Sequence, residues 1–108
     1  WGLLESAVKT GWLRVARGLI AGKQFILYRD PTFIGSHPMS HVYLFRDMGV
    51  GRRHAAIHRV PGGYEIENLP MGTETRVNDR PVTSRQRLSH GDRITVGRTV
   101  LVFEQRET

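Results

Sequence analysis

Turn-forming residues interrupt this chain so often that no long regular element fits between them. Gly, Pro, Asn and Asp recur at intervals of about 8–12 residues or less. The segments between them alternate in polarity: in Tyr64-Glu65-Ile66-Glu67 the apolar side chains fall on one face of a strand and the carboxylates on the other. Short alternating strands joined by tight turns predict an all-β antiparallel sandwich.

About ten short strands are expected from this pattern. The segments that carry it are 12–17, 24–28, 32–35, 42–45, 54–60, 64–67, 75–77, 93–96 and 99–104. Two turns are especially distinct. Asn78-Asp79 suits the positive φ angles of a tight hairpin, and Gly91-Asp92 is a second such pair.

The opening stretch has a different period and predicts a short helix. Between Gly2 and Thr10 the apolar side chains fall on one side of a helix, opposite Glu5 and Lys9, and Gly11 would end it. Such a helix of two turns is too short to be stable alone in water. We therefore expect a helix or connector over residues 1–11 and one folded domain over residues 12–106.

The length and composition describe a small globular domain. A chain of 108 residues has room for one modest core, and with no Cys it has no disulfide and no thiolate metal site. No apolar run approaches the roughly 20 residues needed to cross a bilayer. The first residue is Trp1 rather than Met, so we expect a segment of a longer protein.

The charge balance raises the possibility of an anionic partner. The net charge is +6, and fourteen of the sixteen basic residues are Arg. A basic nucleic-acid or acidic-lipid surface binder is therefore one alternative. However, the basic residues are scattered from Lys9 to Arg106, and the longest run is the pair Arg52-Arg53. We expect a solvated Arg-rich surface and no nucleic-acid partner.

Residues for catalysis or metal binding do not form a recognisable set. On a strand, His54 and His58 would share a face but stand about 13 Å apart, too far for one zinc ion. His37 and His41 lie in a loop with no third ligand in view. No serine lies in a nucleophile elbow, and no glycine pair opens a helix as a phosphate cradle. We expect no enzymatic activity, cofactor, metal or small-molecule substrate.

An ordered series of short motifs resembles the forkhead-associated (FHA) domain family. The motifs are Phe33-Ile34-Gly35, Arg53 to Ile57, Gly63 to Leu69, Gly72-Thr73, Val77-Asn78, Leu88, Gly91 to Gly97 and Leu101 to Phe103. They span about Trp12 to Glu104. The resemblance implies a two-sheet sandwich of eleven strands whose ligand loops gather at one end. It also implies a structural role for Gly35, His54 and Gly72, with the two glycines at tight turns beside those loops.

The departures from the family pattern fall on its phosphothreonine-binding positions. Ser36 replaces an Arg that follows a Gly, Gly51 replaces the Ser of a Ser-x-x-His motif, and Met71 replaces the Asn of an Asn-Gly-Thr signature. The remaining ligand-loop candidates implied by the resemblance are Thr73 and Asn78. Arg52 and Arg53 follow Gly51, and because guanidinium groups bind phosphate in a bidentate manner they could compensate for these losses.

These residues predict an FHA-type protein–protein interaction module that binds independently of phosphorylation, or binds phosphopeptides only weakly. The alternative within the family is phosphothreonine-peptide binding restored by Arg52 and Arg53. The expected partner is a protein or peptide, phosphorylated or not, and a neighbouring segment of the same protein is a further candidate. We expect a cytoplasmic location. One alternative is the cytoplasmic domain of a membrane-anchored protein, since a helix leading into the sandwich resembles bacterial proteins whose FHA domain follows membrane-spanning helices.

Overall fold

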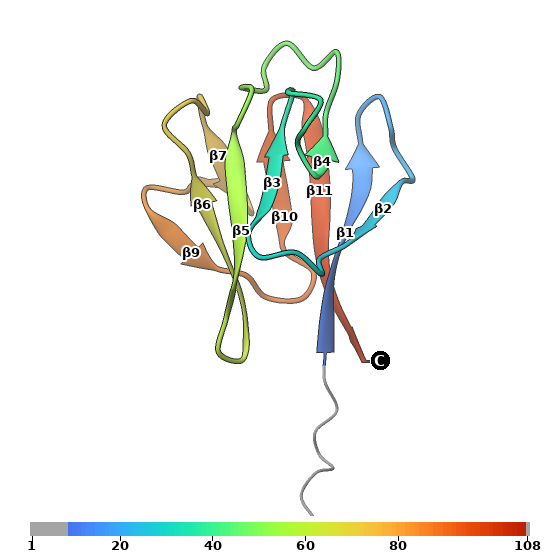
Figure 1. Ribbon diagram of the computed structural model, residues 1–108, viewed down its shortest axis with the longest axis vertical. Coiled ribbons are helices and arrows are strands. Elements are labelled where there is room, and N and C mark those ends of the chain that lie inside the picture. Colours follow the sequence, from blue (N-terminus) through green and yellow to red (C-terminus); the bar gives the residue numbers. More distant parts are fainter. Residues whose placement is uncertain (1–8, 108) are drawn as a thin grey trace, which may run out of the picture.

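Two β-sheets face each other across a common core in the computed structural model, which describes residues 9–107 (Figure 1). One sheet has six strands in the order β2-β1-β11-β10-β7-β8, and the other has five in the order β4-β3-β5-β6-β9. Every pairing is antiparallel except that of β3 with β4. The strands are β1 (Lys9–Arg17), β2 (Gln24–Ile26), β3 (Thr32–Gly35), β4 (Val42–Tyr43), β5 (Ala55–Val60), β6 (Gly63–Asn68), β7 (Thr75–Val77), β8 (Arg80–Pro81), β9 (Arg85–Arg87), β10 (Arg93–Val96) and β11 (Thr99–Glu107).

The core is formed by alternate side chains of both sheets, as the sequence predicts. Tyr64 and Ile66 are buried, whereas Glu65 and Glu67 between and after them are only partly buried. The Tyr64 ring meets Phe103 of the opposite sheet edge-on, with 5.5 Å between ring centroids. The all-β sandwich of eleven strands is therefore confirmed.

The predicted N-terminal helix lies almost wholly outside the described residues. Its last two residues, Lys9 and Thr10, are instead the first residues of β1 and pair with Glu107 and Arg106 of β11. The part of the helix prediction that covers these two residues is wrong, because the long β11 gives them a strand partner that a local pattern cannot reveal.

Gly11 does not end a helix either. It lies within β1, where an added Cβ would come 2.7 Å from the Tyr64 ring. The Gly11 backbone N–H donates to the Tyr64 hydroxyl at 3.0 Å. This glycine therefore serves the packing of one sheet on the other, and the sandwich begins three residues earlier than expected.

Several elements agree with their predicted bounds. β3, β7 and β10 occupy the expected residues, and the turn at Asn78 and Asp79 has φ angles of 51° and 69°. β8 and β9 were not predicted individually, since segments of two and three residues are too short to show alternation.

The connections β3–β4, β4–β5 and β6–β7 lie at one end of the sandwich, together with those between β1 and β2 and between β10 and β11 (Figure 1). Lys9 and Glu107, which pair with each other, lie at the opposite end. Residues 9–107 contain no helix that is long and apolar enough to cross a membrane.

Candidate ligand-binding loops

Three loops at one end of the sandwich are joined to one another by hydrogen bonds to backbone carbonyls. The β3–β4 loop contacts the β4–β5 loop where the Ser36 N–H donates to the Gly51 carbonyl at 3.0 Å and the His37 N–H donates to that of Arg52 at 3.2 Å. The β6–β7 loop joins them through the Thr73 hydroxyl, which donates to the Gly49 carbonyl at 3.4 Å. The residues predicted in these loops are thus brought together.

Three glycines allow this close approach of the loops. A Cβ on Gly35 would collide with the Arg52 carbonyl, one on Gly51 with the Met71 carbonyl, and one on Gly72 with the His54 carbonyl. None of the three has a positive φ. The sequence predicted tight turns at Gly35 and Gly72, but the observed requirement is space between neighbouring backbones rather than an unusual backbone angle.

The difference between Gly51 and a serine at this position is therefore more than a missing hydroxyl, because even a Cβ has no space here. Any side chain there meets the β6–β7 backbone at Met71, and the Gly51 N–H is already used by the Nδ1 atom of His54 at 3.0 Å. The loop geometry itself excludes a side chain at this position.

His54 lies at the centre of the loop packing. Its side chain is fully buried, and its Nε2 lies 2.7 Å from the Glu74 carbonyl. Since Nδ1 accepts from Gly51, the proton is on Nε2, which donates to Glu74. One neutral imidazole therefore joins the β4–β5 loop to the β6–β7 loop. This geometry agrees with the structural role that the resemblance implies for His54, which stays a prediction until tested.

The two loop arginines lie in different surroundings. The Arg53 guanidinium stacks on the Phe33 ring at 4.4 Å, over the outer face of β3. Arg52 is exposed, and its backbone carbonyl accepts from His37. Both side chains are exposed, so both are accessible to a ligand at the loop end.

Asn78 lies away from these loops. Its side-chain amide donates to Asp92 at 2.9 Å and accepts from the Arg93 N–H at 3.0 Å. At the other end of β7, the Thr75 hydroxyl donates a hydrogen bond to the side chain of Asn68, the last residue of β6. The structure thus places Asn78 in the β7–β8 turn and does not bring it together with the other ligand-loop candidates.

Sequence reasoning missed Asp47, which ties the β4–β5 loop to the β10–β11 turn. Its carboxylate accepts hydrogen bonds from the Gly49 N–H at 3.1 Å, the Arg98 N–H at 2.8 Å and the Thr99 hydroxyl at 2.8 Å. An Asp two residues before a Gly is a turn signal that could have indicated the local bond. The two bonds to residues about fifty positions away could not have been read from the sequence.

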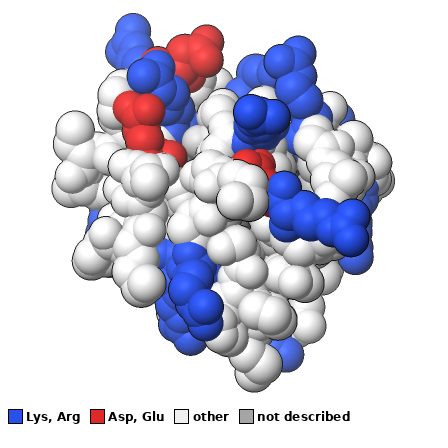
Figure 2. Space-filling view, turned by 90° about the horizontal axis from the view of Figure 1, so that it is seen from above, with Lys and Arg blue, Asp and Glu red and all other residues white. Residues whose placement is uncertain are grey.

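Seen from the loop end, the surface carries several basic groups and smaller acidic patches, with uncharged atoms between them (Figure 2). All three methionines lie in these loops and are exposed: Met39 by 76%, Met48 by 97% and Met71 by 61%. The Lys and Arg atoms form separate groups in this view rather than one continuous face. Among residues 9–107, no cluster of three or more His, Asp or Glu side chains could hold a metal ion.

A two-sheet sandwich of this topology, with its loops clustered at one end around a buried histidine, defines the class of FHA domains. A family model described as "Inner membrane component of T3SS, cytoplasmic domain" matches residues 14–107. The chain belongs to this family of FHA-like domains.

Relatives and solved structures agree with this assignment. An oxoglutarate dehydrogenase inhibitor of Corynebacterium diphtheriae is 41% identical over 93 residues, which is 86% of this chain and 64% of the relative. The glycogen accumulation regulator GarA of Mycolicibacterium smegmatis is 37% identical over 91 residues, covering 84% of this chain and 56% of the relative. The chain thus spans under two thirds of the length of these relatives. The FhaA FHA domain, solved in complex with the intracellular domain of Rv3910, superposes with a TM-score of 0.75 at 26% identity, covering 87% of this chain and 99% of that one.

Proposed function

We propose that this domain is a non-enzymatic interaction module that binds a protein partner through its three loops without requiring phosphothreonine. Two relatives are described as an inhibitor and a regulator, and the FhaA FHA domain, which has a similar structure, was solved in complex with another protein. A regulatory role through binding, on the cytoplasmic side of a membrane as in the matched family, follows by analogy.

The observation that carries the proposal is the closed packing around Gly51. A phosphate group needs donors directed into the loop end, yet the Gly51 N–H is taken by His54 and no side chain fits on its Cα. A hydrogen bond to a charged group contributes about 1.5–3 kcal/mol. Losing two or three such hydrogen bonds removes roughly 3–9 kcal/mol of binding free energy, whereas the whole binding free energy of a micromolar complex is only about 8 kcal/mol.

The exposed methionines supply a different kind of contact. Thioether side chains are flexible and polarizable, and they adapt to apolar partner surfaces of varied shape. Met48 and Met71 flank the bond between Thr73 and Gly49 that joins their two loops. A partner that covers this part of the surface would bury both, and Met71 stands where the family has a polar amide.

An array of phosphothreonine peptides with degenerate flanking residues, each beside its unphosphorylated twin, tests the proposal. We expect less than about tenfold discrimination between the twins, since an exposed charge pair with Arg52 contributes only about 0.2–1 kcal/mol. Any residual preference for the phosphorylated peptide should fall as the salt concentration rises. It should be lost in Arg52→Ala but not in Arg80→Ala, a control at an exposed arginine of β8. Salt-resistant micromolar binding that disappears on dephosphorylation would show the proposal to be wrong.

A further inference from the structure

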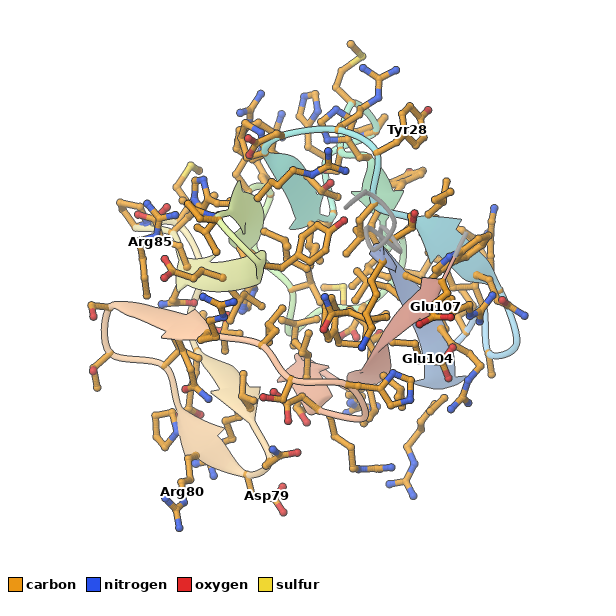
Figure 3. The ribbon with its side chains drawn as sticks, turned by 90° about the horizontal axis from the view of Figure 1, so that it is seen from below. Tyr28, Asp79, Arg80, Arg85, Glu104 and Glu107 are labelled. Atoms are coloured by element: carbon orange, nitrogen blue, oxygen red, sulfur yellow. The ribbon has the colours of Figure 1, made fainter. Side chains whose placement is uncertain are left out.

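The open side of the sandwich, between the edge strands β2 and β4, carries a groove of about 410 Å³. It is lined by Gln24, Phe25, Ile26, Tyr28, Arg29, Thr32, His41 and Val42. None of these residues belongs to the ligand-loop set. Tyr28 is exposed by 66% and Ile26 by 41%, so apolar groups that could pack in a core lie in contact with solvent. Figure 3 shows the Tyr28 side chain at the margin of the molecule, outside the sheets.

The backbone of β2 presents free hydrogen-bonding groups to this groove. The Val15 N–H donates to the Lys23 carbonyl and the Leu27 N–H to that of Gly11, each at 2.8 Å, so odd-numbered residues of this strand face β1. In an antiparallel edge strand the intervening residues direct their N–H and C=O groups outward. Gln24 and Ile26 therefore offer an unpaired edge to an incoming strand, and Tyr28 lies two residues beyond the end of β2.

This edge differs from two other sheet edges of the molecule. β8 ends in Pro81 and β9 consists of Arg85, Gln86 and Arg87, and proline and charge are two devices by which proteins prevent strand addition. By contrast, the three residues of β2 carry no charge. The edge that faces the apolar groove is thus left open to pairing.

Cations flank the β2 segment, with Lys23 before Gln24 and Arg29 after Tyr28. The Lys23 ammonium lies 5.5 Å from the centroid of the Phe25 ring, and the Arg29 guanidinium 5.3 Å from that of Tyr28. Asp30, the acidic residue next along the chain, accepts a hydrogen bond from the Arg59 N–H on β5. Glu104 and Glu107 belong to β11, which β1 separates from β2 in the sheet (Figure 3). An occupant with acidic side chains at both ends would be electrostatically complementary.

We propose that β2 binds an extended segment of a partner protein as an additional antiparallel strand, with apolar side chains directed into the groove and acidic side chains meeting Lys23 and Arg29. In such strand addition the main-chain bonds supply affinity and the alternate side chains supply specificity. The β2 edge lies outside the three loops of the proposed function, and of the residues that line the groove only His41 lies in one of them, the β3–β4 loop. Either proposal can therefore fail without the other.

A second copy of this domain does not fit the same edge. Two β2 strands pairing antiparallel about Ile26 would bring Lys23 of one copy opposite Arg29 of the other. Like charges directly opposite each other destabilise a strand pair. The charge pattern therefore favours an acidic partner segment over self-pairing.

The test uses the peptide Glu-Thr-Val-Thr-Val-Thr-Glu and the 108-residue chain. In antiparallel register its glutamates oppose Lys23 and Arg29, its valines oppose Phe25 and Leu27, and its threonines pair with the outward backbone groups. We expect amide NMR shifts at Gln24, Ile26 and Tyr28 and none at Met71.

The same peptide with lysine ends should bind roughly tenfold more weakly at low salt. N-methylation of the threonine amides should abolish binding, whereas N-methylation of the valine amides should not.

Variants of the domain complete the test. Lys23→Glu combined with Arg29→Glu should reverse the preference in favour of the lysine-ended peptide, while Arg80→Glu combined with Arg85→Glu, on the other edges, should leave it unchanged. Equal binding of the two peptides, equal effects of the two methylated sets, or shifts confined to the loop end would overturn the proposal. Shifts at Ile26 that depend on protein concentration without peptide would indicate self-pairing and also contradict it.

Discussion

His54 and Glu74 are joined by a hydrogen bond of 2.7 Å between the imidazole Nε2 and the backbone carbonyl oxygen. The same ring accepts the Gly51 N–H on its other nitrogen, so one buried side chain closes two loops on each other. Its partners are backbone groups, and they do not depend on a ligand.

Replacement of His54 by Ala should lower the free energy of unfolding by at least about 1–3 kcal/mol, because two buried backbone groups lose their partner. Thermal and urea melts measure the loss. His58→Ala is the control, since His58 forms a partly exposed pair with Glu67 that contributes about 0–1 kcal/mol. Equal stability of the two variants would argue against a structural role for His54.

Gly51→Ser should destabilise the domain by about 1–3 kcal/mol or more, because the new Cβ meets the Met71 carbonyl and one of the two loops must move. Gly35→Ala and Gly72→Ala should behave alike. Gly63→Ala serves as control, since its Cβ would meet only the movable Arg87 side chain.

Because a side chain at residue 51 meets the Met71 carbonyl, Ser36→Arg, Gly51→Ser and Met71→Asn together should not create phosphothreonine binding. A stable triple variant that gains it would contradict this account of the loops.

Asp47→Ala should loosen the β4–β5 loop from the β10–β11 turn and reduce stability by about 1–3 kcal/mol, because two backbone N–H groups and a hydroxyl lose a charged acceptor. Amide hydrogen exchange should accelerate at Gly49 and Arg98 while β5 and β6 stay protected. Unchanged protection at Arg98 would show that the carboxylate does not hold this turn.

The pKa of His41 lies below its ordinary value of 6.5, because burial of part of the ring disfavours the charged form and Arg29 and Arg53 lie nearby. Its Nδ1 accepts the Phe33 N–H at 2.9 Å. The unfolded chain therefore binds this proton more readily, so the contribution of His41 to stability is present above pH 6.5 and is lost as the pH falls toward the folded-state pKa.

An NMR titration of the imidazole checks this expectation. The His41 midpoint should lie below 6.5 and should rise in Arg53→Ala. The stability difference between wild type and His41→Gln should shrink between about pH 7.5 and about pH 5.5. A midpoint at or above 6.5 would contradict the proximity of the two guanidinium groups.

The strands were predictable wherever a local pattern determines them. β3, β7 and β10 lie where alternation and turn residues predicted them, and the backbone at Asn78 and Asp79 has the positive φ angles expected of that pair. Lys9 and Thr10 were misread because helical periodicity in the preceding residues is a local signal, whereas pairing with β11 is not. Tertiary pairing overrode a weak local preference.

The proximity of the candidate loop residues was predictable from the sequence, but the geometry of the loops was not. Motif order placed Ser36, Gly51, Met71 and Thr73 near one another, and the loops do meet. The stacking of Arg53 on Phe33 and the bonds from Asp47 to the β10–β11 turn depend on loops that are distant in sequence. Nothing in their own neighbourhoods indicates them.

The sequence by itself determined the class of this protein, because alternation and turn chemistry act over a few residues and their order along the chain is readable directly. It also shows Ser36, Gly51 and Met71 at positions where the family resemblance implies an Arg, a Ser and an Asn. Only the tertiary structure decided that Gly51 has no room for a side chain and that β2 offers an open edge beside an apolar groove. Both depend on how closely separate backbones approach, which is set by the packing of the whole sandwich rather than by any segment of it.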